Sequence, residues 1–161
     1  MGAQPLMGNF VKGPGQILNV PLFSATLSSE VKEINMTNDT DVADIMAAVK
    51  IYFDGLYDSN TDMLAHVFHP DCRIIGYGSD GKMVIMTADH FFKFVATVPS
   101  PKAEGVPFDM SILGIERTGK VASVRVHDFY LGRDFIDHLH LVETDGGWLI
   151  TSKMFHSEAR D

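Results

Sequence analysis

Hydrophobic residues recur every three or four positions over one long stretch in the first half of the chain. This spacing predicts a helix with a single buried side. Thr40 is placed to cap its first turn, which Asp41 and Asp44 also suit, and the sequence DSN at 58–60 ends the pattern. The positions expected to be buried are Val42, Ile45, Val49, Tyr52 and Leu56.

Two shorter helices are predicted after this one. The first covers roughly residues 61–68 and stops at His69-Pro70, because proline disfavours helical conformation in the residue before it. The second opens at Thr87 and has Phe91, Phe94 and Val95 on its apolar side. The proline-rich linker VPSPKAEGVP, residues 98–107, ends it.

The remaining hydrophobic segments have the alternation and the turn residues of strands. Two short strands flank a Ser-Asp-Gly turn within residues 72–86. The last third of the chain predicts four longer strands joined by tight turns at Thr118-Gly119, Gly132-Arg133 and Asp145-Gly146. These strands are expected at residues 108–116, 120–131, 134–144 and 148–155.

Helices followed by an antiparallel meander predict an α+β fold. One face of a mostly antiparallel, curved sheet is then covered by the three helices. Residues 41–157 form this single domain, and residues 158–161 form a short tail. Residues 1–40 are rich in Gly, Pro, Ser and Asn and are expected to be an irregular arm with one short strand near residues 18–27.

Strand alternation divides the polar residues of HDFYLGRDFIDHLH, residues 127–140, between the two faces of the sheet. If Gly132-Arg133 is the turn, Asp128 lies opposite Asp137, and both share the helix-covered face with Tyr130 and Phe135. If Asp145-Gly146 is the next turn, residues of the last strand alternate in register with them. That register places Ile150, Ser152, Met154 and His156 on the covered face, and His127, His138, His140 and Lys153 on the opposite face.

The two aspartates are the candidate catalytic residues. Burial and mutual repulsion would raise at least one carboxyl pKa, which suits Asp128 or Asp137 to act as a general base beside a carbonyl group. The alternative is that they are hydrated beyond the covered region, or that a bulge moves one aside. Register is sensitive to a shift of one residue, so this assignment depends on the turns.

Five further residues are candidate ligand contacts. Tyr130 and His156 could donate to a ligand oxygen, although His156 is equally suited to be a solvated residue near the chain end. The Tyr52 hydroxyl needs a partner, either in a pocket or on the backbone. Phe135 and Met154 would line the apolar part of the same face.

No metal or cofactor is predicted. His66, His69 and Asp71 lie close in sequence, but the proline after His69 interrupts the helical spacing that would align two ligands. Cys72 lies in an apolar strand, where a lone cysteine is usually a small buried hydrophobic residue.

Several segments resemble the nuclear transport factor 2-like superfamily, and most closely its lumazine-binding or SnoaL-like group. They are YFDGLYDSNTDML (52–64), VFHPDCRI (67–74), the third predicted helix at 91–95, and the strands from VASVRV to SKMFH (121–156). The resemblance implies a cone with an internal cavity and homodimers formed between exposed sheet faces. The superfamily includes isomerases, dehydratases, cyclases and non-catalytic binding subunits, so the fold does not fix the activity.

The composition of the chain limits the kinds of partner that it can bind. The 161 residues carry a net charge of −8, which disfavours binding to nucleic acid or to an anionic membrane. The single cysteine excludes a disulfide framework, and no apolar run is long enough to span a membrane, so we expect a cytoplasmic protein.

Three functions remain open on these grounds. The first is a protein that binds a small apolar or aromatic molecule in a cavity with an acidic and hydroxyl-bearing rim. The second is a cofactor-independent isomerase, dehydratase or cyclase with an aspartate base. The third is a dimeric protein-interaction subunit.

Overall fold

A computed structural model describes residues 7–11, 17–21 and 39–160, with side chains from residue 42 onward. The chain divides into two units, Met1–Ile34 and Asn35–Asp161. In the first unit, β1 (Met7–Val11) and β2 (Ile17–Pro21) form an antiparallel hairpin. The sequence predicted one strand here, and the part of that prediction beyond Pro21 lies outside the described residues.

The second unit contains three helices and a six-stranded sheet. The helices are α1 (Asp39–Tyr57), α2 (Thr61–Val67) and α3 (Ala88–Thr97). The strands are β3 (Phe68–Tyr77), β4 (Met83–Thr87), β5 (Met110–Thr118), β6 (Val121–Tyr130), β7 (Arg133–Thr144) and β8 (Gly147–Ala159). The helix α1 begins at Asp39, one residue before the predicted cap.

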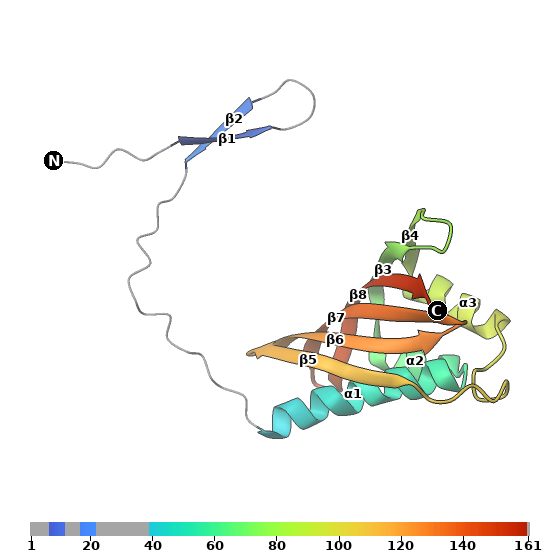
Figure 1. Cartoon of the computed structure of the whole chain (residues 1–161). Coiled ribbons are helices and arrows are strands. Elements are labelled where there is room, and N and C mark those ends of the chain that lie inside the picture. Colours follow the sequence, from blue (N-terminus) through green and yellow to red (C-terminus); the bar gives the residue numbers. More distant parts are fainter. Residues whose placement is uncertain (1–6, 12–16, 22–38, 161) are drawn as a thin grey trace. The chain divides into compact units, whose positions relative to one another are not determined.

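The strands are ordered β4-β3-β8-β7-β6-β5, and every neighbouring pair is antiparallel except β3 and β8. The three helices gather along one face of this sheet (Figure 1). The predicted α+β class is therefore confirmed. The core lies between the helices and that face, and it includes Ile45, Val49, Leu56, Val124 and Leu139, each at most 1% exposed.

Side-chain caps fix where the two shorter helices start. Asn60 accepts hydrogen bonds from the backbone N–H groups of Asp62 and Met63 at the start of α2. Thr87 does the same for His90 at the start of α3, as the sequence predicted. Pro70 follows the end of α2, and the chain is extended there.

The turn between β6 and β7 lies one residue earlier in the chain than predicted. Leu131 and Gly132 form it, with φ angles of 52° and 74°, while Arg133 already pairs with Tyr130. The predicted pairing of Asp128 with Asp137 is wrong, because Asp128 lies opposite Phe135 and Asp137 opposite Val126. The error shifts the register by two residues, so the side chains of β6 and β7 keep their predicted faces.

The strand β8 contains a bulge that the sequence analysis did not anticipate. The turn at Asp145-Gly146 is as predicted, and the pairing is regular as far as Leu141 and Ile150. The next pair is His140 with Ser152, so Thr151 is the extra residue. A single extra residue reverses the alternation of everything after it. The strand also continues to Ala159, through the first half of the predicted tail.

Candidate functional site

A cavity of about 410 Å³ lies among α1, α3 and the covered face of the sheet. This volume is in the range of small-molecule sites. Its wall is mainly aliphatic and aromatic, and its polar residues lie at a few positions. The lining includes Leu56, Ile74, Val84, Met86, Phe91, Phe94, Asp128, Tyr130, Leu131, Arg133, Phe135, Lys153, Phe155 and Ser157.

Asp128 is the acidic residue of the cavity wall and is only 1% exposed. Burial raises the pKa of Asp128 well above the usual carboxyl range, because a charged carboxylate loses its hydration there. The negative charge of Asp137 raises this pKa further, and the ammonium group of Lys153 opposes the increase. Asp128 is therefore a neutral carboxylic acid over a wider pH range than an exposed aspartate.

Asp137 lies behind the cavity wall and is fully buried. Its Oδ2 accepts a hydrogen bond of 2.6 Å from the Tyr52 hydroxyl and also contacts the ammonium group of Lys153. Lys153 in turn donates a 2.6 Å hydrogen bond to the Tyr52 oxygen. The buried charges of Asp137 and Lys153 thus form a compensated pair, which a buried charge requires.

Two carboxyl oxygens of this cluster lack a hydrogen-bond donor among the described residues. They are Oδ2 of Asp128 and Oδ1 of Asp137. A hydrogen bond between the two side chains also favours protonated Asp128, which supplies the donor that such a bond needs. When Asp128 is protonated and the ion pair of Asp137 with Lys153 is intact, the cluster has no net charge.

Lys153 belongs to the cavity wall as well as to the buried pair. Its nitrogen lies 5.7 Å from the centre of the Phe155 ring and 6.0 Å from that of Phe91, both of which line the cavity. Since an ammonium group has three donors and two are used by Tyr52 and Asp137, one remains for a ligand.

The structure brings together most of the residues that the sequence singled out. Asp128, Tyr130 and Phe135 line the cavity, while Tyr52 and Asp137 stand one layer behind it. The pKa of Tyr130 rises to about 12, because burial outweighs the opposing effect of the Ser59 hydroxyl. For Tyr52, burial is again the largest cause of a pKa well above the usual value for tyrosine.

Met154 and His156 do not lie on the predicted face. The bulge at Thr151 turns both to the outer face, where Met154 is 44% exposed and His156 lies 3.4 Å from the Glu158 carboxylate. The same bulge turns Lys153 inward, so the prediction that Lys153 faces outward is wrong. One signal in the sequence could have revealed that Lys153 faces inward. Two inward aspartates in an apolar core require a cation, and Lys153 is the lysine of β5 to β8 whose strand position lies nearest to theirs.

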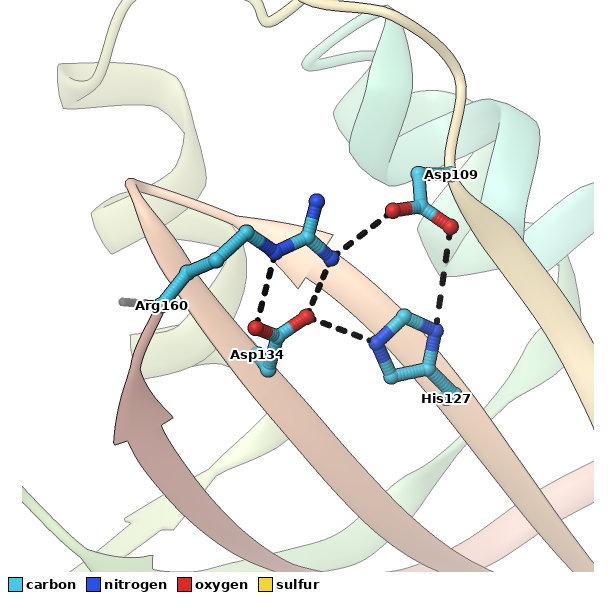
Figure 2. A network of polar contacts seen from close by, with 4 residues as sticks. All are labelled: Asp109, His127, Asp134 and Arg160. Carbon is cyan, nitrogen blue, oxygen red and sulfur yellow. Dashed lines mark hydrogen bonds and ion pairs between the residues drawn. The ribbon is translucent and has the colours of Figure 1, made fainter.

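A second polar cluster lies on the outer face of the sheet (Figure 2). Arg160 donates to the carboxylates of Asp134, at 2.8 Å, and Asp109, at 2.7 Å. His127 lies 2.8 Å from the same Asp134 and 3.9 Å from Asp109. Figure 2 shows Asp134 between the guanidinium and the imidazole, so these contacts connect the end of β8 to β6 and β7. The contacts of Arg160 are exposed, and the contact of His127 with Asp134 is partly buried.

Comparison with known proteins identifies relatives of the whole second unit. A family model described as "Putative lumazine-binding" matches residues 40–156. A curated protein from Cladobotryum sp., described as "Aldolase FrzH", is 27% identical over 116 residues, which cover 72% of this chain and 90% of that protein.

Solved structures match at the level of the fold. An NTF2-like protein of unknown function from Shewanella baltica has a TM-score of 0.68 at 24% identity, covering 78% of this chain and 100% of that one. Another, from Silicibacter pomeroyi, has a TM-score of 0.66 at 20% identity, covering 76% and 100%. These likenesses confirm the nuclear transport factor 2-like fold. Within residues 39–160, no helix is both long enough and apolar enough to cross a bilayer.

Proposed function

The chain belongs to the "Putative lumazine-binding" family, and from this premise we propose that its cavity binds a small, largely apolar molecule through a carbonyl oxygen. The family and the cone fold suggest small-molecule binding in general. The single observation that supports the finer proposal is the pairing of a neutral acid, Asp128, with the ammonium group of Lys153 at the polar end of an apolar cavity.

The chemistry of this pair selects the type of ligand atom. The third N–H of Lys153 is available as a donor, while the single O–H of protonated Asp128 is held by Asp137, so this end of the cavity complements an acceptor oxygen. The cluster has no net charge, since the carboxylate of Asp137 already compensates Lys153. A charged group placed against Asp128 and Lys153 would therefore have no counter-ion there, whereas the neutral carbonyl of a ketone or aldehyde needs none. Arg133, which also lines the cavity, donates to Ser157.

A second candidate function is aldol-type chemistry on such a carbonyl compound. It is favoured by the similarity to the protein described as "Aldolase FrzH" and by the same ammonium donor. An enolate formed from the ligand has its negative charge on the oxygen that Lys153 contacts. Donors placed where charge develops are the usual source of stabilisation for such intermediates.

The test of ligand binding uses two substitutions on neighbouring residues of β4. Val84 lines the cavity and Ile85, which is 61% exposed, does not. With 4-phenyl-2-butanone as the probe, we expect saturable binding by isothermal titration calorimetry in the wild type and in Ile85→Trp. Val84→Trp fills the cavity and should abolish the binding. Equal binding by the two variants, or none in the wild type, would contradict the proposal.

We also propose that the protein is a homodimer formed through the outer face of the sheet. The half-exposed Met154 lies on that face and pairs with His138 across β7 and β8. The superfamily resemblance supports dimerisation through this side. The interaction with a different protein, which was the third possibility from the sequence, has no feature of the described residues that favours it over self-association.

A further inference from the structure

We propose that Lys153 reacts with the bound carbonyl compound and forms a Schiff base. This inference rests on the proposed binding of an aldehyde or ketone in the cavity and assigns the covalent step to one amine. It makes Lys153 the catalytic nucleophile of aldol-type chemistry, and it makes Asp128 and Asp137 its proton donor and acceptor.

Burial singles out Lys153 from the other lysines. It is 5% exposed, and it is the one buried lysine among the side chains that the structure describes. By contrast, the side chains of Lys50, Lys93 and Lys102 are 71%, 71% and 63% exposed and are paired with surface aspartates. A nucleophilic lysine needs an apolar environment and contact with the substrate, and only Lys153 of these has both.

The neighbours of Lys153 provide a place for the proton that the ammonium group must lose. An amine attacks a carbonyl only after deprotonation, and the Oδ2 atom of Asp137 is in direct contact with the lysine nitrogen. The Tyr52 hydroxyl bonds to both groups, so it holds the acceptor in line with the amine. The aromatic rings of Phe91 and Phe155 limit the space beside the amine to an apolar ligand.

The step balances without any oxidant or cofactor. The ammonium proton passes to Asp137, and the free amine forms a bond to the carbonyl carbon as the carbon–oxygen π bond breaks. The proton of Asp128 goes to the oxygen, and the nitrogen returns one proton to Asp128, which leaves a neutral carbinolamine. Asp137 then protonates the hydroxyl group, water leaves, and the carbon–nitrogen double bond forms. The net reaction converts an ammonium group and a carbonyl compound into a protonated imine and one water molecule.

Reductive trapping tests this assignment. The wild-type protein is incubated with 4-phenyl-2-butanone and sodium cyanoborohydride, and intact mass spectrometry follows the product. A reduced imine adds the mass of the ketone less one oxygen atom. We expect a single adduct, and peptide mapping should place it on Lys153. Adducts on Lys50, Lys93 or Lys102 with none on Lys153 would overturn the inference.

Two substitutions separate the chemistry from folding and binding. Lys153→Arg keeps a cation but cannot form an imine, so the adduct should disappear, while the surface control Lys102→Arg should leave it unchanged. Asp137→Asn removes the proton acceptor and should slow adduct formation by about 100-fold while the ketone still binds. If Lys153→Arg does not fold, the mapped site in the wild-type protein decides the question.

Calorimetry without the reductant measures ketone binding separately from formation of the Schiff base. Binding of the ketone with no adduct would overturn the Schiff base and leave the proposed function standing. An absence of binding by the wild-type protein would remove the proposed function, and the Schiff base with it.

Discussion

At the scale of single residues, the main feature is the buried charge pair of Asp137 and Lys153. Removing one partner of a buried pair leaves an uncompensated charge, which costs about 3–5 kcal/mol. We therefore expect Lys153→Met to lower the free energy of unfolding by that amount in urea denaturation. Asp137→Leu together with Lys153→Met should recover a large part of the loss, because no buried charge is then left.

The control for this prediction is Lys93→Met. Lys93 pairs with Asp89 on the exposed surface of α3, and a pair of that kind contributes little. If Lys153→Met were as mild as Lys93→Met, the buried pair would not have the role assigned to it.

The raised pKa of Asp128 has a defined effect on stability. The folded state binds its proton more tightly than the unfolded chain, in which the pKa is near 3.8. The contribution of Asp128 is therefore fully present below that pH and is lost as the pH rises toward the folded-state pKa. Asp128→Asn has no proton to lose, so its stability relative to the wild type should increase with pH above about 4.

Urea denaturation of both proteins at several pH values between 3.5 and 8 measures this difference. A constant difference between the two proteins across the series would show that Asp128 has an ordinary carboxyl pKa in the folded state.

The residues that strand alternation predicted correctly lie before the bulge, and those it misplaced lie after it. Asp128 and Asp137 were expected inside and are buried. Met154 and Lys153 exchanged faces, because one extra residue at Thr151 cannot be read from a period of two. The central cation of the site was missed for this reason alone.

At the scale of the elements, the β6–β7 turn has a residue in an unfavourable conformation. Leu131 has a φ of 52°, a region that costs a residue other than glycine or asparagine roughly 1–2 kcal/mol. Leu131→Asn should therefore stabilise the protein by about 1 kcal/mol. Gly132→Ala, at a φ of 74°, should destabilise it by about the same amount.

Chemical denaturation of these two variants should show changes in the free energy of unfolding that are similar in size and opposite in sign. A loss of stability in Leu131→Asn would mean that the apolar contacts of Leu131 at the cavity outweigh its backbone strain.

The elements themselves could be predicted because each has a strong local signal. The apolar stripe of α1, the Thr87 cap of α3 and the alternation of β6 and β7 all appear in the sequence. The position of the β6–β7 turn could not, since Gly-Arg is a better match to a two-residue turn than Leu-Gly. The shift of two residues left the side chains of β6 and β7 on their predicted faces. It did separate the two aspartates that were expected to lie opposite each other.

At the scale of the whole molecule, the outer sheet face is the expected dimer interface. Sedimentation equilibrium should give twice the mass of one chain for the wild type. Met154→Asp places a charge on this face and should yield monomers, whereas Met46→Asp, at an exposed position of α1, should not. A monomeric wild-type protein, or a dimer indifferent to Met154→Asp, would refute this interface.

The central claim is that Lys153, beside protonated Asp128, selects a ligand oxygen at the end of an apolar cavity. Its most direct test is the affinity of the wild-type protein for 4-phenyl-2-butanone compared with butylbenzene, a hydrocarbon of similar shape without the oxygen, measured by titration calorimetry. We predict that the ketone binds at least about tenfold more tightly, because the hydrocarbon leaves the third N–H of Lys153 buried without an acceptor. Equal affinities, or tighter binding of butylbenzene, would contradict the claim.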